Sequence, residues 1–178
     1  MELEAQSICI NCGLCCDGTM FHAVDVDESD DLVPLRAKGA LLISDAESRR
    51  FAQPCSAFDG TCCSVYEARP TSCRAFVCGL LQSVTNGDTS PGDARFAIEE
   101  VKTLASVVRE RLDLSVETDV VQLGRHGLST YLGVMANQYE PDRLRELFPE
   151  ADQLIDILRR DFGWTNRTTR GRNQEPTT

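Results

Sequence analysis

The stretch Cys9-Ile10-Asn11-Cys12-Gly13-Leu14-Cys15-Cys16 holds four of the nine cysteines of this 178-residue chain. The other five form a second island: Cys55, Cys62, Cys63, Cys73 and Cys78. The rest of the chain has no cysteine. Thiols gathered in this way predict that residues 1–90 form a metal-binding region.

The spacing within the first island is typical of a metal-binding loop. Gaps of two residues separate Cys9, Cys12 and Cys15, so their sulfurs can reach one centre from a tight turn. Gly13 would let the backbone curl without a Cβ clash. Thiolates bind Zn²⁺, Cu(I) and iron–sulfur clusters, and this spacing also begins the ferredoxin run that holds a [4Fe–4S] cluster. Cys16 directly follows Cys15, which indicates a second metal or a different face of the same site.

Two other interpretations of the cysteines are less favoured. A single cysteine is commonly a small buried hydrophobe, but nine concentrated in 78 residues are not explained in this way. A disulfide framework conflicts with the odd number and with an acidic N-terminus, Met1–Gln6, that has no signal-peptide run. We therefore expect a cytoplasmic protein, since thiols stay reduced there.

The net charge and the absence of known enzyme motifs limit which partners the protein can bind and which reactions it can catalyse. The net charge of −10 argues against nucleic acid, which needs a cationic face, and no apolar run is long enough for a membrane helix. The phosphate-binding, nucleophile-elbow and zinc-protease motifs are absent. Catalytic residues are therefore unknown, although a thiol beside Arg69 or Arg74 would have a lowered pKa.

The second island predicts a hairpin followed by a helix. Asp59-Gly60 is a turn signal that would bring Cys55 back beside Cys62 and Cys63. Neighbouring side chains on a strand point to opposite faces, so Cys62 and Cys63 should not both face one site. The run from Arg69 to Arg74 predicts a turn that leads into a helix carrying Cys73 and Cys78.

The ordered pattern over residues 9–80 resembles the YkgJ-type cysteine-cluster family, whose CxxCxxCC domain is described as zinc- or iron-chelating. The run that carries the resemblance continues through Cys63-Ser64-Val65-Tyr66 and Arg69-Pro70 to Cys73-Arg74 and Cys78. The resemblance implies eight ligands and leaves Cys62 as the extra thiol. These ligands are Cys9, Cys12, Cys15, Cys16, Cys55, Cys63, Cys73 and Cys78.

The resemblance implies a metal-binding protein whose two islands jointly hold an iron–sulfur cluster, such as [4Fe–4S], or Zn²⁺. Eight thiolates allow two tetrahedral zinc sites, or one cluster with four thiols left over. One related branch methylates lysines of flagellin. A cluster-dependent protein-modifying enzyme such as a lysine N-methyltransferase is therefore an alternative, as is a thiol-based redox sensor or metal carrier.

Three further residues are candidates for supporting roles. Arg69 and Arg74 flank Pro70 and Cys73, where they could donate N–H groups to sulfur or offset the charge of a bound centre; surface salt bridges are the alternative. His22 could be a ligand or proton carrier, although a lone histidine is more often structural. His126 is expected in a loop.

The hydrophobic pattern predicts an α+β protein. Short strands are expected within residues 20–26 and 40–43, an extended segment at 48–53, and a helix at 32–37 that Gly39 ends. After a linker at 86–92, Ser90-Pro91 should open an amphipathic helix that reaches Leu112. Further helices are expected at 127–137, from Pro141, and from Pro149 to Gly163.

These elements predict three regions. Residues 1–90 are the small, irregular cysteine-rich lobe with short strands. Residues 91–164 are a helical C-terminal part packed on it as one globular unit. Residues 165–178 have almost no apolar content and are expected to be a disordered tail.

Overall fold

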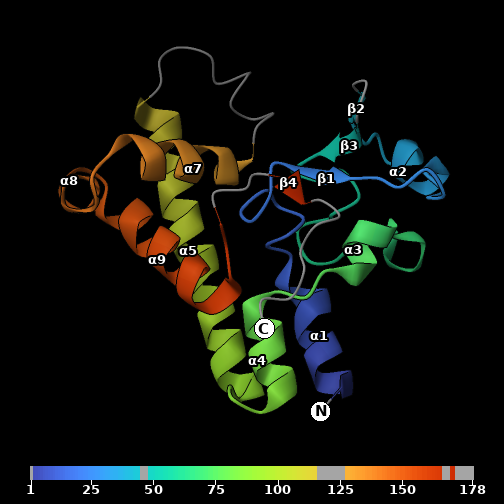
Figure 1. The fold of residues 1–178 in the computed structure, drawn as a ribbon, viewed down its shortest axis with the longest axis horizontal. Helices are drawn as coiled ribbons and strands as arrows, with labels where there is room; N and C mark the ends of the chain where they lie inside the picture. The colour runs from blue at the N-terminus through green and yellow to red at the C-terminus, as the bar shows by residue number, and fades with distance from the viewer. Residues whose placement is uncertain (1, 45–47, 116–126, 166–168, 171–178) are drawn as a thin grey trace.

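The computed structural model describes residues 2–44, 48–115, 127–165 and 169–170 (Figure 1). The fold is α+β, as the sequence predicts: the cysteine-rich half contains a small sheet and short helices, and longer helices follow. The helices are α1 (Glu2–Cys12), α2 (Val33–Ala37), α3 (Thr71–Ala75), α4 (Gly79–Asn86), α5 (Pro91–Ser115), α7 (Leu128–Gln138), α8 (Pro141–Leu147) and α9 (Pro149–Phe162), with a 3₁₀ helix, η1 (Tyr66–Ala68). The strands are β1 (Ala23–Asp25), β2 (Leu42–Ser44), β3 (Arg49–Ala52) and β4 (Thr169–Arg170).

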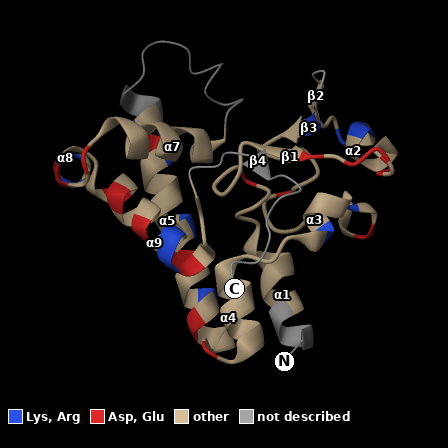
Figure 2. Ribbon diagram, viewed as in Figure 1, with Lys and Arg blue, Asp and Glu red and all other residues tan. Residues whose placement is uncertain are grey.

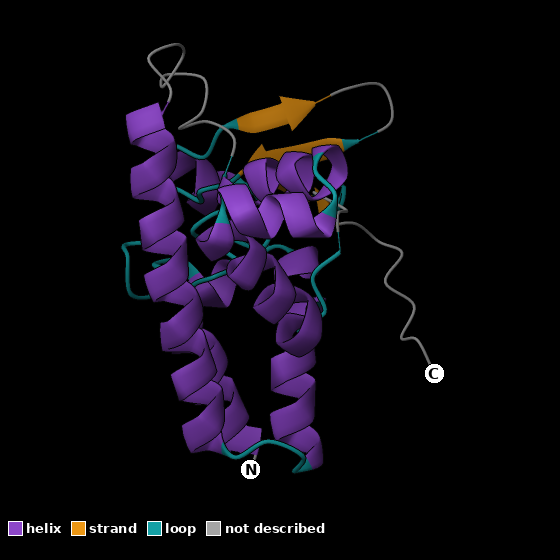
Figure 3. Cartoon of the chain, turned by 90° about the vertical axis from the view of Figure 1, so that its left-hand side faces the viewer, coloured by secondary structure: helices purple, strands orange, loops and turns teal. Residues whose placement is uncertain are grey.

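Helix α5 is the longest element and the one against which other helices pack. It lies along α9, which also contacts α7 and α8, while α1 and α4 pack against each other and against α5. Figure 1 shows α1 and α4 side by side at one end of α5, and Figure 3 shows the strands gathered at the other end of the molecule. The helical part therefore includes two helices, α1 and α4, from the cysteine-rich half of the chain.

The predicted helix boundaries after residue 86 are confirmed. The Ser90 hydroxyl donates to the Asp93 carboxylate and accepts from its backbone N–H, so Ser90 caps α5. Pro149 opens α9, and Gly163 ends it with a φ of +69°. The predicted stripe of α5, including Ile98, Val101 and Val108, is buried.

The sheet has the strand order β2-β3-β1-β4. Strands β2, β3 and β1 are antiparallel, with Val24 opposite Phe51, and both of these side chains are buried. Thr169 and Arg170 form β4, which pairs with β1 in parallel. These two residues therefore differ from the predicted disordered tail, because their backbone pairs with a sheet edge; residues 166–168 and 171–178 lie outside the described residues.

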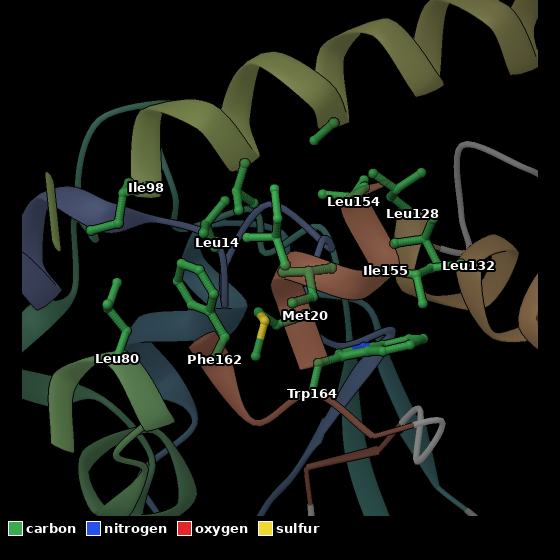
Figure 4. Close-up of a cluster of buried hydrophobic side chains, with 14 of the residues drawn as sticks. Leu14, Met20, Leu80, Ile98, Leu128, Leu132, Leu154, Ile155, Phe162 and Trp164 are labelled. Atoms are coloured by element: carbon green, nitrogen blue, oxygen red, sulfur yellow. The ribbon is translucent and has the colours of Figure 1, made fainter. Parts of the chain in front are cut away.

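Two separate hydrophobic cores hold the molecule together. The larger core joins α4, α5, α7, α8 and α9 with Ile8 of α1 and with Leu14, Met20 and Phe21 from the first cysteine island and the residues after it (Figure 4). The smaller core lies beside the sheet and contains Val24, Val26, Leu32, Leu35, Phe51, Cys55 and Ala57.

Charged residues lie on the outer faces of α5, α8 and α9, whereas α4 has none (Figure 2).

Two aspects of the cysteine-rich half differ from the predictions. Cys73 and Cys78 do not share a helix, because α3 ends at Ala75 and Phe76 is extended; Cys78 is instead the N-cap residue of α4. Helix α1 extends through Cys12, so Cys9 and Cys12 lie on a helix. Within the described part of the chain, no helix has the length and apolar character needed to span a bilayer.

Candidate metal centre

All eight cysteines of the predicted ligand set line one cavity of about 730 Å³. The cavity lies where α1, the loop after it, the chain following β3, α3 and the start of α4 meet. Cys62 is not among the lining residues. The nine cysteines form no disulfides, so their sulfurs are thiols. Two islands about forty residues apart in sequence are thus brought to one place by the fold.

The first island is shaped by the end of α1. Cys9 and Cys12 are three residues apart on this helix, and therefore near each other on one face. The chain then reverses at Gly13, whose φ is +76° and whose carbonyl accepts from the N–H groups of Cys16 and Asp17. Leu14 is buried in the larger core and anchors the loop. The turn brings Cys15 and Cys16 to the cavity.

The second island is held on the first by the backbone. The Cys55 N–H donates to the Cys16 carbonyl, N to O 2.7 Å. Phe58 and Cys63 form a β-bridge, and the Asp59 carboxylate accepts from the N–H groups of Thr61 and Cys62. The predicted hairpin is therefore present, with residues 59–62 as its loop.

The hairpin separates the two neighbouring thiols. Cys63 lines the cavity, whereas the Cys62 sulfur donates to the Asp59 carboxylate, 3.5 Å away. This hydrogen bond raises the pKa of the Cys62 thiol above its usual value. Cys62 therefore lies on the side of the hairpin away from the other thiols.

The last two thiols come from the starts of two short helices. Cys73 lies in α3, whose first residue Thr71 donates its N–H and hydroxyl to the Asp30 carboxylate, both at 2.8 Å. Cys78 caps α4, and its sulfur accepts from the Leu81 N–H at 3.5 Å. A Cβ at Gly79 would be 2.9 Å from the Asp161 carbonyl oxygen, so α4 begins in tight contact with the end of α9. Contacts with distant parts of the chain therefore set the positions of Cys73 and Cys78, through the Asp30 carboxylate and the Asp161 backbone respectively.

Burial raises the pKa values of several of these thiols and so disfavours their ionisation. It raises the pKa of Cys12 to about 12, and the nearby Cys78 and Cys9 act in the same direction. Burial is also the main cause of the raised pKa values of Cys78 and Cys55, to which Cys9 and Cys63 respectively contribute. A thiolate in such a site needs a compensating cation, and a metal ion supplies one.

Arg69 and Arg74 both line the cavity, as do Tyr66 and Phe76. The Arg69 guanidinium lies 3.5 Å above the Tyr66 ring, and its Nε donates to the Tyr66 carbonyl at 2.8 Å. Arg74 donates to the Thr71 hydroxyl at 3.3 Å. Both cations therefore lie beside the thiols, as expected, but their role toward a metal stays a prediction.

Sequence reasoning missed two cations from α5 that hold the first island. Arg109 donates to the Asp17 carbonyl and carboxylate, each at 3.2 Å, and to the Thr19 hydroxyl at 2.9 Å. Lys102 donates to the Asn11 carbonyl at 3.3 Å. The acidic Asp17 directly after Cys16 was a signal that a cation would approach, but the sequence does not show which one.

The donor chemistry of the site fits a metal, since thiols are the ligands that Zn²⁺ and iron–sulfur clusters take. Among the described residues, no three His, Cys, Asp or Glu side chains are already close enough together to hold an ion. The thiols thus surround a cavity, and binding would draw them inward. His22 is not among the residues that line the cavity, and His126 lies outside the described residues.

Comparison with known proteins identifies the class to which this cysteine-rich half belongs. Residues 8–92 match the family described as "CxxCxxCC: Putative zinc- or iron-chelating domain". The predicted family resemblance is therefore confirmed over residues 8–92, which are similar to this domain. No curated protein and no solved structure was found to match the chain. The family supports metal binding in general and leaves the metal open.

Proposed function

We propose that this is a metal-binding protein whose two cysteine islands jointly hold Zn²⁺ or an iron–sulfur cluster, with [4Fe–4S] as one form. The observation that carries the proposal is the cavity, which is lined by the eight family-type cysteines and not by the ninth. These eight thiols come from segments far apart in the sequence, so the fold itself gathers them at one place. The eight cysteines are the proposed ligands.

A bound centre would supply the positive charge that buried thiolates need. It would also join the two cysteine islands, whose segments meet at the cavity. Arg69 and Arg74 would offset the remaining negative charge of the thiolates and donate N–H groups toward sulfur. We also propose a cytoplasmic location, where the thiols would stay reduced.

Anaerobic purification followed by metal analysis and visible absorption spectroscopy tests this function. An iron–sulfur protein is brown and contains iron and sulfide, whereas a zinc protein is colourless. Cys55→Ser should lower the metal content, and Cys62→Ser is the matched control that should keep it. A wild-type protein that holds neither metal after anaerobic purification would refute the proposal.

A second candidate function rests on the size of the cavity. At about 730 Å³ it falls within the ~300–1,000 Å³ of small-molecule sites. Apolar side chains such as Ile8 and Leu81 line it, together with the polar Gln82, Thr85 and Asn86 of α4. This space would leave room for a small molecule beside the metal, as a cluster-dependent protein-modifying enzyme, such as a lysine N-methyltransferase, would require. Binding of S-adenosylmethionine by the metal-loaded protein, measured by calorimetry, would support it; a wild-type protein without binding would exclude that cofactor.

A further inference from the structure

The peptide bond between Cys15 and Cys16 connects the two hydrophobic cores. Cys15 packs against the larger, helical core, and Cys16 packs against the smaller core beside the sheet. The Cys16 carbonyl accepts the Cys55 N–H at 2.7 Å, which ties this residue to the second island. Cys15 and Cys16 are neighbours in the sequence, but each packs against a different core. Their two sulfurs are therefore poorly placed to ligate one tetrahedral ion.

One group of thiols belongs to the helical side of the cavity. Cys9 and Cys12 lie on α1, Cys15 follows it, and Cys78 begins α4, which packs on α1. Cys12, Cys15 and Cys78 all pack against the larger core. Cys9 is close enough to Cys12 and Cys78 to act on both electrostatically. These four residues therefore form one neighbourhood.

The remaining four thiols belong to the sheet side. Cys55 is part of the smaller core, and Cys16 and Cys73 pack against it. Cys63 lies across the hairpin from Phe58, three residues after Cys55, and lines the cavity together with Cys55. These residues come from the loop after α1, the chain after β3, the hairpin and α3. The second neighbourhood thus has four thiols as well.

Each neighbourhood has cations of its own. Lys102 of α5 donates to the Asn11 carbonyl beside Cys12 and acts electrostatically on that thiol. Arg69 and Arg74 flank Cys73 on the sheet side and line the cavity. Two separately compensated groups are what two anionic centres would require.

We propose that the cavity holds two separate four-thiolate centres instead of one shared centre; this inference rests on the metal-binding function proposed above. Four thiolates complete either a tetrahedral zinc site or a [4Fe–4S] cluster. The helical centre uses Cys9, Cys12, Cys15 and Cys78. The sheet centre uses Cys16, Cys55, Cys63 and Cys73.

The test removes two ligands from one group at a time. The full chain is purified anaerobically as wild type, as the helical variant C12S/C78S, as the sheet variant C55S/C73S, and as the control C62S. Metal and sulfide per chain are measured, together with the absorption spectrum. The two-centre arrangement predicts that the control keeps all of the metal and that each double variant loses the content of one centre and keeps that of the other.

The outcomes separate the inference from the function on which it rests. Loss of all metal in both double variants, each with the wild-type helical circular dichroism, would overturn the two-centre arrangement but leave metal binding intact. A wild type with no metal would refute the metal-binding function itself.

A second measurement needs no variant and so does not depend on how the substitutions fold. Native mass spectrometry follows the wild type while a chelator removes the metal. Two centres predict a populated intermediate that has lost the mass of one complete centre and kept the other. Direct conversion from the fully loaded chain to the metal-free chain would overturn the inference.

Discussion

The two cores of this protein differ in how much of their stability apolar burial can supply. Among the described residues, the helical core contains twenty-two buried hydrophobic side chains contributed by helices along the whole chain. The sheet core contains seven, one of which is a cysteine. Its strands have two to four residues each. A small core of this kind rarely stabilises a lobe without disulfides or metal.

The difference shows where a metal would act. The helical core can fold by burial alone, whereas the sheet lobe would depend on the proposed sheet centre. Cys15 and Cys16 lie at the boundary between the two cores. Metal loss should therefore destabilise the sheet lobe more than the helical core. Five predictions test this comparison.

Removal of metal should have the largest effect. Structural zinc contributes about 10–16 kcal/mol of apparent binding free energy in small domains, comparable to the stability of a whole domain. We expect chelation to expose β1, β3 and α3 while α5 and α9 stay folded. Hydrogen exchange with and without chelator measures this. Unchanged protection of the strands, with the full circular dichroism and melting temperature, would contradict the prediction.

Matched leucine truncations compare the two cores directly. Leu158 in the helical core and Leu35 in the sheet core are both almost completely buried. Each change to alanine should cost about 2–5 kcal/mol locally. Leu158→Ala should lower the denaturation midpoint with and without metal, and Leu35→Ala should mainly lower metal retention. Equal effects on metal retention would mean that the cores are not independent.

Substitution of Gly13 should affect the loop between the cores. Its positive φ costs about 1–2 kcal/mol for alanine, and the added Cβ would overlap the Phe58 ring. Gly60→Ala is the matched control, because Gly60 also has a positive φ but no atom within 4 Å of an added Cβ. We expect Gly13→Ala to be the more destabilising by urea denaturation and to lose metal faster. Equal losses would show that Phe58 adapts freely.

Removal of Arg109 tests the link from α5 to the first island. Arg109→Met deletes its hydrogen bonds to Asp17 and Thr19, at an expected cost of about 1–3 kcal/mol. Arg109→Lys keeps the charge and should recover part of this. A double-mutant cycle with Asp17→Asn measures the coupling. Additive effects of the two changes would mean that the ion pair contributes little.

Acid should produce the smallest effect, at Asp30. Burial acts to raise its pKa, but hydrogen bonds from Thr71 and Asp27 outweigh burial and lower the pKa below the usual 3.8. A lowered folded pKa means that the contribution to stability is present above the unfolded value and is lost as the pH falls through the folded one. We expect wild type to lose slightly more stability than Asp30→Asn below pH 3.8. Parallel acid curves would contradict this.

Much of the helical fold could be predicted because its signals are local. Ser90-Pro91, Pro149 and Gly163 mark helix ends by their own backbone preferences, and the apolar stripe of α5 marks its buried face. Helices α1 and α4 were missed. Helix α1 contains Cys9 and Cys12, whose spacing favours a loop, and α4 begins directly after Cys78, which the sequence places on the same helix as Cys73.

The sequence by itself predicted that Cys62 and Cys63 would face opposite ways, because strand alternation is a local property, and the family resemblance implied the other eight cysteines as ligands. Only the tertiary structure decided that eight thiols surround one cavity and that Cys15 and Cys16 lead to different cores. It also brought Arg109 to Asp17 across 92 positions of the chain. Such contacts depend on how helices and strands pack over long sequence separations, and no local pattern encodes them.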